Sequence, residues 1–174
     1  RSGFWASGSG SGKVQEFEKK FSKYLNSDQC VAVNSGTAAL NLALSLLDIK
    51  NKEVILPSLS FIATAHAVIL NGGKPVFADI DPNTHNIDPN SIEERITKKT
   101  KAIIPVSHDG LPYDIDSVMK IANEHNLVVI EDNAQAPGAL YHGKYAGCVS
   151  DIGVFSLNYH KHIHTGEGGI CVTN

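Results

Sequence analysis

The chain has 174 residues, of which 42% are hydrophobic and 19% are charged, and its formal net charge is -3. This length suffices for one α/β domain with a packed core. The acidic balance provides no basic field for nucleic acid or an anionic membrane, and no apolar run approaches the roughly 20 residues of a membrane-spanning helix, so we expect neither partner.

Helical and strand patterns alternate along the chain after a lead-in rich in Gly and Ser. In chain order we predict the lead-in over 2–12, helix 14–25, strand 30–33, helix 38–47, strand 54–56, helix 62–71, strand 75–78, helix 91–97, strand 102–106, helix 115–125, and strands 127–130, 152–155 and 169–172. Such alternation predicts an α/β fold with a mostly parallel sheet and helices on both faces. The last two strands lack a long crossover, so we expect them to be antiparallel to their neighbours.

The cysteines and the chain ends suggest where the protein works. Cys30, Cys148 and Cys171 have no metal-type spacing, and an odd count without a secretory signal favours free thiols in a reducing, cytoplasmic setting. The chain begins at Arg1 and stops at Asn174 directly after an apolar run. We therefore expect a longer natural protein, with a lead-in loop and helix over residues 1–27 and one large domain over 28–174.

A glycine-containing turn follows the first predicted strand, where ligands of open parallel sheets bind. Asn34, Ser35, Gly36 and Thr37 lead directly into a helix. Backbone N–H groups at a helix N-terminus suit a phosphate, and a threonine hydroxyl can add a donor. A plain N-cap by Ser or Thr is the alternative.

Two adjacent acids follow the strand over residues 127–130. Strand alternation places Glu131 and Asp132 on opposite faces, so only one of them can point into a given pocket. A buried carboxylate needs a cation, such as a metal or a protonated heterocycle. The alternative is a helix N-cap at a strand–helix junction.

A lysine among aromatic and imidazole groups follows the strand over residues 152–155. A lysine that performs chemistry must be desolvated or close to a cation, and Lys161 stands in an unusual setting before a glycine-rich turn. The rival interpretation is a zinc site, because His160, His162 and His164 would share one face of an extended strand. No acid or cysteine completes that set, which counts against a metal.

The serine- and glycine-rich stretch over residues 7–13 ends in a lysine and resembles a nucleotide-binding loop only superficially. Ser7 occupies the first glycine position of a P-loop, and Val14 follows Lys13 where Ser or Thr is required. We therefore interpret the stretch as a linker or a substrate-facing loop.

Five segments in a fixed order resemble one enzyme family. They cover residues 34–40, 57–64, 75–81, 130–136 and 155–169. Together they are similar to the DegT/DnrJ/StrS-type family of pyridoxal-phosphate-dependent sugar aminotransferases, over essentially the whole chain. The resemblance implies the large domain of fold-type-I aminotransferases, with a mixed, mostly parallel sheet, and the absence of the small C-terminal domain from this chain.

The resemblance assigns four residues to the cofactor ring. Lys161 resembles the catalytic lysine that carries pyridoxal 5'-phosphate as a Schiff base, and Asp132 resembles the acid that pairs with the pyridine nitrogen. Phe61 matches the aromatic that stacks on the ring, although a core aromatic is the alternative. Gln135 matches a residue near the phenolic oxygen. In this scheme Lys161 moves a proton and Asp132 keeps the ring nitrogen protonated, which makes the ring an electron sink.

Three further residues fall where the family binds the cofactor phosphate, namely Gly36, Thr37 and Ser156. No metal is implied. The implied substrates are an amino-acid donor, glutamate in particular, and a nucleotide-linked keto-sugar, for polysaccharide or surface-glycan biosynthesis. Family members form homodimers with shared active sites, so we expect a homodimer at full length and little activity from this fragment alone.

Two stretches depart from the family pattern. Many relatives have His one position before His108, in the loop that here reads Val-Ser-His-Asp-Gly, so His108 substitutes from one position along or the sugar contacts differ. The residues around Lys161 are also atypical. Some relatives replace this lysine with His and catalyse dehydration, so a sugar-nucleotide dehydratase stays an alternative, as does a non-catalytic binding relative. Retention of Lys161 and Asp132 favours transamination.

Overall fold

The structure, a computed structural model, describes residues 12–174. Its elements in chain order are α1 (Lys13–Leu25), β1 (Gln29–Val33), α2 (Gly36–Ser45), β2 (Glu53–Pro57), α3 (Ile62–Leu70), β3 (Lys74–Ala78), α4 (Pro89–Arg95), β4 (Thr100–Ile103), the 3-10 turn η1 (His108–Gly110), α5 (Ile115–His125), β5 (Val128–Asp132), β6 (Leu140–Tyr141), β7 (Lys144–Tyr145), β8 (Ile152–Ser156) and β9 (Gly169–Thr173). Every predicted helix and strand is present, with ends shifted by a few residues. The short β6, β7 and η1 were not predicted. The predicted lead-in and the serine- and glycine-rich stretch lie outside the described residues, apart from Gly12 and Lys13.

One seven-stranded sheet organises the chain, in the order β1-β9-β8-β5-β4-β2-β3. Its strands pair in parallel from β8 through β5, β4 and β2 to β3, whereas β9 is antiparallel to both of its neighbours, β1 and β8. The predicted mostly parallel sheet is thus confirmed. The expectation that the last two strands are antiparallel to their neighbours is confirmed for β9. It is wrong for β8, which pairs in parallel with β5. The connection over residues 133–151 is long enough for a parallel crossover although it contains no helix.

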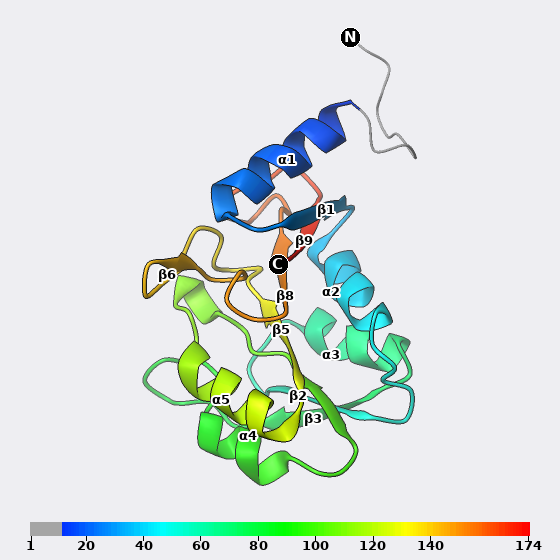
Figure 1. The fold of residues 1–174 in the computed structure, drawn as a ribbon, viewed down its shortest axis with the longest axis vertical. Coiled ribbons are helices and arrows are strands. Elements are labelled where there is room, and N and C mark those ends of the chain that lie inside the picture. Colours follow the sequence, from blue (N-terminus) through cyan, green and yellow to red (C-terminus); the bar gives the residue numbers. More distant parts are fainter. Residues whose placement is uncertain (1–11) are drawn as a thin grey trace.

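Helices cover both faces of the sheet, as Figure 1 shows, with α2 and α3 on one face and α4 and α5 on the other. The strand period of two divides the core between these faces. Val54 and Leu56 of β2 pack in the cluster with α2 and α3, whereas Ile55 packs in the cluster with α5. All residues of β2 are buried, as expected of a strand between two helical layers.

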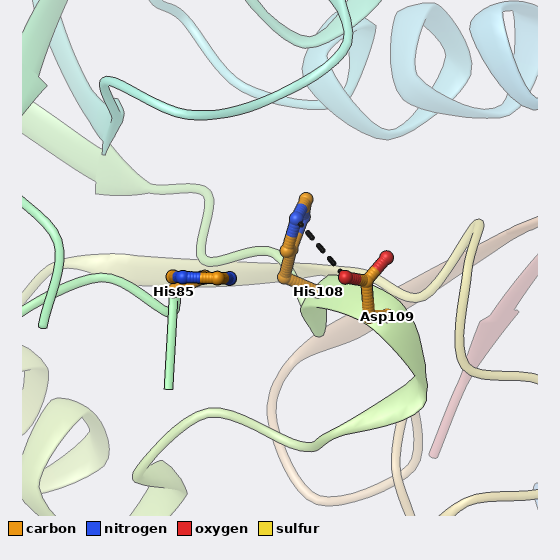
Figure 2. A group of neighbouring side chains, drawn as sticks. All are labelled: His85, His108 and Asp109. Carbon is orange, nitrogen blue, oxygen red and sulfur yellow. Dashed lines mark ion pairs between the residues drawn. The ribbon is translucent and has the colours of Figure 1, made fainter. Parts of the chain in front are cut away.

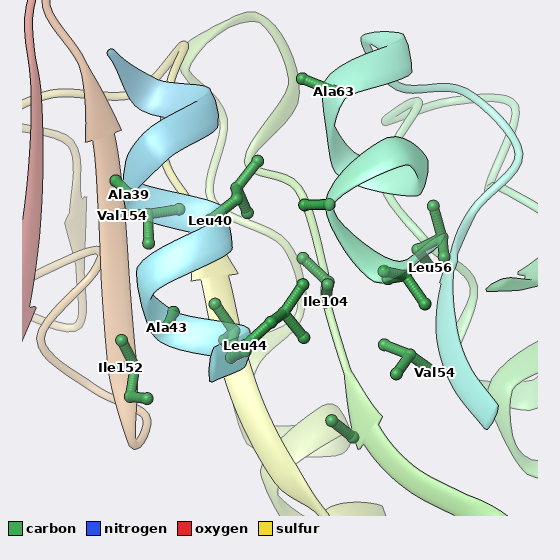
Figure 3. Packing of buried hydrophobic residues seen from close by; sticks show 14 of the residues in the cluster. Ala39, Leu40, Ala43, Leu44, Val54, Leu56, Ala63, Ile104, Ile152 and Val154 are labelled. Atoms are coloured by element: carbon green, nitrogen blue, oxygen red, sulfur yellow. The ribbon is translucent and has the colours of Figure 1, made fainter. Parts of the chain in front are cut away.

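The cluster between α2 and the central strands anchors the helix that reaches the ligand-binding edge. Leu40 and Leu44 of α2 belong to the same buried cluster as Ile152 and Val154 of β8, and Figure 3 shows these side chains between the helix and the sheet. Each of these four side chains is at most 8% exposed. Burying one such side chain contributes roughly 1.5–3 kcal/mol, so the position of α2 relative to β8 is well fixed.

None of the helices within residues 12–174 combines the length and the apolar character that crossing a bilayer requires. This agrees with the absence of a long apolar run in the sequence.

Candidate functional site

A cavity of about 660 Å³ lies at the carboxyl ends of the parallel strands. β1, β2, β5 and β8 share one direction, so the segments that follow them meet at one edge of the sheet. All seven residues that the sequence assigned to the cofactor line this cavity: Gly36, Thr37, Phe61, Asp132, Gln135, Ser156 and Lys161.

The turn before α2 forms one wall of the cavity. Ser35 is the N-cap of α2, and its hydroxyl accepts a hydrogen bond from the Ala38 N–H at 3.1 Å. A Cβ added to Gly36 would lie 2.8 Å from the Cβ of Ser156, so only glycine allows the turn to approach the end of β8. The capping alternative is confirmed, and the phosphate hypothesis stays a prediction that is compatible with it. Ser35 caps the helix, while the first amides of α2 remain at a positive helix end that suits a phosphate.

Asp132 ends β5 at the floor of the cavity. Its side chain is buried, and its two oxygens accept hydrogen bonds from the Thr64 hydroxyl at 2.9 Å and from the Ala134 N–H at 3.1 Å. Burial raises the pKa of Asp132, while the Ala134 N–H, the Thr64 hydroxyl and the charge of Lys161 oppose that rise. A cation placed against this carboxylate would relieve the burial cost.

Glu131 points away from this cavity, as strand alternation predicted. Its carboxylate accepts the N–H groups of Gly147, Val149 and Ser150 at 2.9–3.0 Å, together with the Ser150 hydroxyl at 3.0 Å. No helix begins directly after β5 in the described chain, so the alternative that Glu131 or Asp132 caps one is wrong.

Lys161 lies in the loop between β8 and β9. It is half-buried, lines the cavity, and its backbone N–H donates to the Asn158 carbonyl at 2.8 Å. Its ammonium lies close enough to Asp132 to oppose the rise in that carboxyl's pKa. The loop is not a strand, so among residues 12–174 the imidazoles of His160, His162 and His164 do not gather into a set of metal ligands. The extended strand on which the zinc alternative depended is therefore not present at these residues.

Phe61 and Gln135 lie at the rim of the cavity. Phe61 directly precedes α3 and is 71% exposed, so the alternative of a core aromatic is wrong. Gln135 Oε1 accepts the N–H of Asp109 at 2.8 Å, which ties the loop after β5 to the loop after β4.

Sequence reasoning assigned no role to Thr64 or Asp109, and it discussed His108 only as a departure from the family pattern. Thr64 donates to Asp132, and its hydroxyl also lies 2.7 Å from that of Ser60. The spacing of four between Ser60 and Thr64 at the start of a helix was the available signal. His108 and Asp109 both line the cavity, which brings the atypical loop after β4 into the site.

A helix N-terminus, a buried carboxylate and an amine that line one cavity suit an enzyme that holds a phosphorylated, cationic ring beside a lysine. Residues 1–174 match the family model of the DegT/DnrJ/EryC1/StrS aminotransferases, and the chain belongs to that family. Family membership and the groups that line this cavity together indicate pyridoxal phosphate as the cofactor.

Relatives and solved structures agree with this assignment. The chain is 46% identical over 162 residues to GDP-perosamine synthase of Caulobacter vibrioides, covering 92% of this chain and 44% of the relative. It is 46% identical over 147 residues to dTDP-3-amino-3,6-dideoxy-alpha-D-galactopyranose transaminase of Aneurinibacillus thermoaerophilus, and the match covers 84% of this chain and 40% of the relative. A Streptococcus pneumoniae protein solved in its PLP form superposes with a TM-score of 0.95 at 31% identity, and the match covers 100% of this chain and 48% of that protein. The chain thus spans less than half the length of these relatives.

Proposed function

We propose that the full-length protein is a pyridoxal-phosphate-dependent transaminase that moves an amino group from glutamate to a nucleotide-linked keto-sugar. The observation that carries the proposal is that Lys161 and Asp132 line one cavity, next to the turn at Gly36 and Thr37. The names of two relatives, a GDP-perosamine synthase and a dTDP-sugar transaminase, support the substrate class.

Each group has a distinct task in this proposal. The open amides at the start of α2, the Thr37 side chain and Ser156 hold the phosphate, and Phe61 covers the ring. Asp132 holds a proton on the ring nitrogen, and the Thr64 hydroxyl orients the Asp132 carboxylate. When bound, pyridoxal phosphate supplies an electron sink for the substrate carbanion. The free Lys161 amine would serve as the base and acid that takes a proton from the amino-acid substrate and returns it during the transfer.

The proposed assembly is a homodimer at full length. The exposed face of α3 carries the apolar side chains of Ile62, Ile69 and Leu70, which are 55–73% exposed. Exposed apolar patches of this kind mark association surfaces. A monomer in sedimentation equilibrium of the full-length protein would contradict this part. We propose that the enzyme is cytoplasmic and acts in surface-glycan synthesis. The name of a spore coat polysaccharide biosynthesis protein among the relatives supports the role in glycan synthesis.

The decisive experiment is borohydride reduction of the full-length holoenzyme followed by peptide mapping. We expect a reduced pyridoxyl adduct on Lys161, and no adduct in a Lys161→Ala variant. Lys144→Ala, on the short strand β7, is the matched control and should keep the adduct. Recovery of the Lys161 peptide unmodified, from protein that contains the cofactor, would refute the assignment.

A substrate assay separates transamination from the dehydratase alternative. With glutamate and a keto-sugar nucleotide, the transaminase should form 2-oxoglutarate and amino-sugar in equal amounts. Loss of water from the sugar without 2-oxoglutarate would favour the dehydratase, and binding without turnover would favour a non-catalytic relative.

A further inference from the structure

Two loops that are distant in sequence bring three potential metal ligands together at the mouth of the cavity. His85 belongs to the loop between β3 and α4, and His108 and Asp109 belong to η1 after β4. Figure 2 shows the three side chains gathered around His108. One ligand atom from each lies within 4.8 Å of the other two, and this is the one such group found among residues 12–174.

We propose that His85, His108 and Asp109 form a site for a divalent transition metal, with Zn²⁺ as the best-fitting ion. Two imidazoles and one carboxylate are a ligand set that zinc accepts with a fourth, open position, whereas Mg²⁺ and Ca²⁺ prefer oxygen ligands. The same set also suits Fe²⁺, but a given site generally binds Zn²⁺ more tightly than Fe²⁺. None of the three residues belongs to the proposed cofactor contacts, so the metal site can be tested separately from cofactor binding.

The distances are close to those that zinc requires. Tetrahedral Zn²⁺ with bonds of 2.0–2.2 Å separates its ligand atoms by about 3.4 Å. His108 Nε2 and Asp109 Oδ2 are already 3.6 Å apart. The ligand atom of His85 lies within 4.8 Å of the other two, and because His85 is exposed its ring can rotate closer at little cost.

The surroundings leave one nitrogen of His108 open to a metal. Nδ1 of His108 is buried, whereas Nε2 lies 3.6 Å from Asp109 Oδ2, so Nε2 is the nitrogen that would bind the ion. The loop beneath is held in place, because the His108 N–H donates to Asn86 Oδ1 and the Asp109 N–H donates to Gln135 Oε1. The site therefore combines a fixed backbone with side chains that can adjust.

The proposed metal site borders the cofactor cavity. His108 and Asp109 line the cofactor cavity, while His85 approaches from outside it. A metal held by all three residues would therefore lie beside the cofactor cavity.

The test is competition for Zn²⁺ between a chromogenic chelator and the tag-free, full-length holoenzyme, with Co²⁺ absorption as a second readout of the ligand geometry. We expect one tight equivalent, and visible d–d bands of four-coordinate Co²⁺. His85→Asn and Asp109→Asn should each weaken Zn²⁺ binding more than about 100-fold, because even outer-shell partners of metal ligands contribute 10–100-fold. Asn suits both positions, since His85 and Asp109 have φ values of 60° and 50° and Asn tolerates the left-handed region.

Two controls make the result decisive. His125→Asn removes an exposed histidine at the end of α5 and should leave the Zn²⁺ affinity unchanged. The double variant His160→Asn, His162→Asn tests whether the loop that carries Lys161 binds the ion instead, and it too should leave the affinity unchanged. Absence of a tight equivalent in the wild-type protein, or loss of binding only in the His160/His162 variant, would overturn the proposal.

Discussion

Glu131 and Asp132 are adjacent carboxylates at the end of one strand, and the protein uses them in opposite ways. Both are buried, Glu131 completely and Asp132 with 5% exposed. Glu131 accepts four hydrogen bonds from the segment that begins at Gly147 and ends at Ser150. Asp132 accepts two, one from Thr64 and one from Ala134, and faces the cavity.

The difference shows how a buried carboxylate can be classified without a ligand in place. An ionised carboxylate offers about four acceptor positions. The protein itself fills those of Glu131, which therefore holds the loop before β8 in place. Asp132 keeps unused capacity toward a cavity, and such unused capacity at a buried charge indicates that a ligand completes the site.

The largest expected effect comes from removing the charge of Asp132. Asp132→Asn should lower kcat of the full-length enzyme roughly 10²–10³-fold, a loss of about 2.7–4 kcal/mol, because a neutral amide cannot hold a proton on the ring nitrogen. Steady-state transamination measures the change. The borohydride adduct on Lys161 should persist, which separates lost chemistry from lost cofactor. An unchanged kcat would remove Asp132 from the mechanism.

The corresponding substitution at residue 131, from carboxylate to amide, should lower the stability of the protein and leave its catalytic rate unchanged. Glu131→Gln places an amide NH₂ against backbone N–H donors, at Gly147 or at Val149 and Ser150. We expect a loss of about 2 kcal/mol in the free energy of unfolding, measured by urea denaturation of the full-length protein. In the fraction that remains folded, kcat should stay close to the wild-type value. A stability equal to that of the wild type would contradict the structural role of Glu131.

Two features of the site could be predicted from the sequence: the opposite orientations of Glu131 and Asp132, and the meeting of the motifs at one edge of the sheet. A period of two separates neighbouring side chains in any strand, so the opposite orientations of Glu131 and Asp132 were predictable from sequence. Parallel strands bring their carboxyl ends to one edge, so the motifs after β1, β2, β5 and β8 were predictable as neighbours.

The partners of these groups were beyond sequence reasoning because they depend on tertiary packing. The Thr64 hydroxyl reaches Asp132 across 68 positions of sequence. The donors to Glu131 come from a crossover without a helix, the same connection that makes β8 parallel to β5, against expectation. The proximity of His85 to His108 likewise depends on how two loops pack.

The smallest expected effect concerns the stability of the protein without its cofactor. Burial raises the pKa of Asp132 above its value in the unfolded chain. The charged form is therefore disfavoured in the folded state, and this cost is fully present above the folded pKa. The cost disappears as the pH falls through the folded pKa toward the unfolded value.

Asp132→Asn removes that cost, so the variant without cofactor should be more stable than the wild-type apoprotein at neutral pH, by about 1 kcal/mol. This difference in stability should shrink as the pH approaches the pKa of an ordinary aspartate, about 4. Loading with pyridoxal phosphate should reverse the order, because a protonated ring neutralises only the wild-type carboxylate. Thermal unfolding of both proteins, with and without cofactor across this pH range, measures the effect. A stability difference between the two apoproteins that does not change with pH would show that burial of the charged Asp132 costs nothing that a ligand could relieve. The different uses of Asp132 and Glu131 would then not depend on charge.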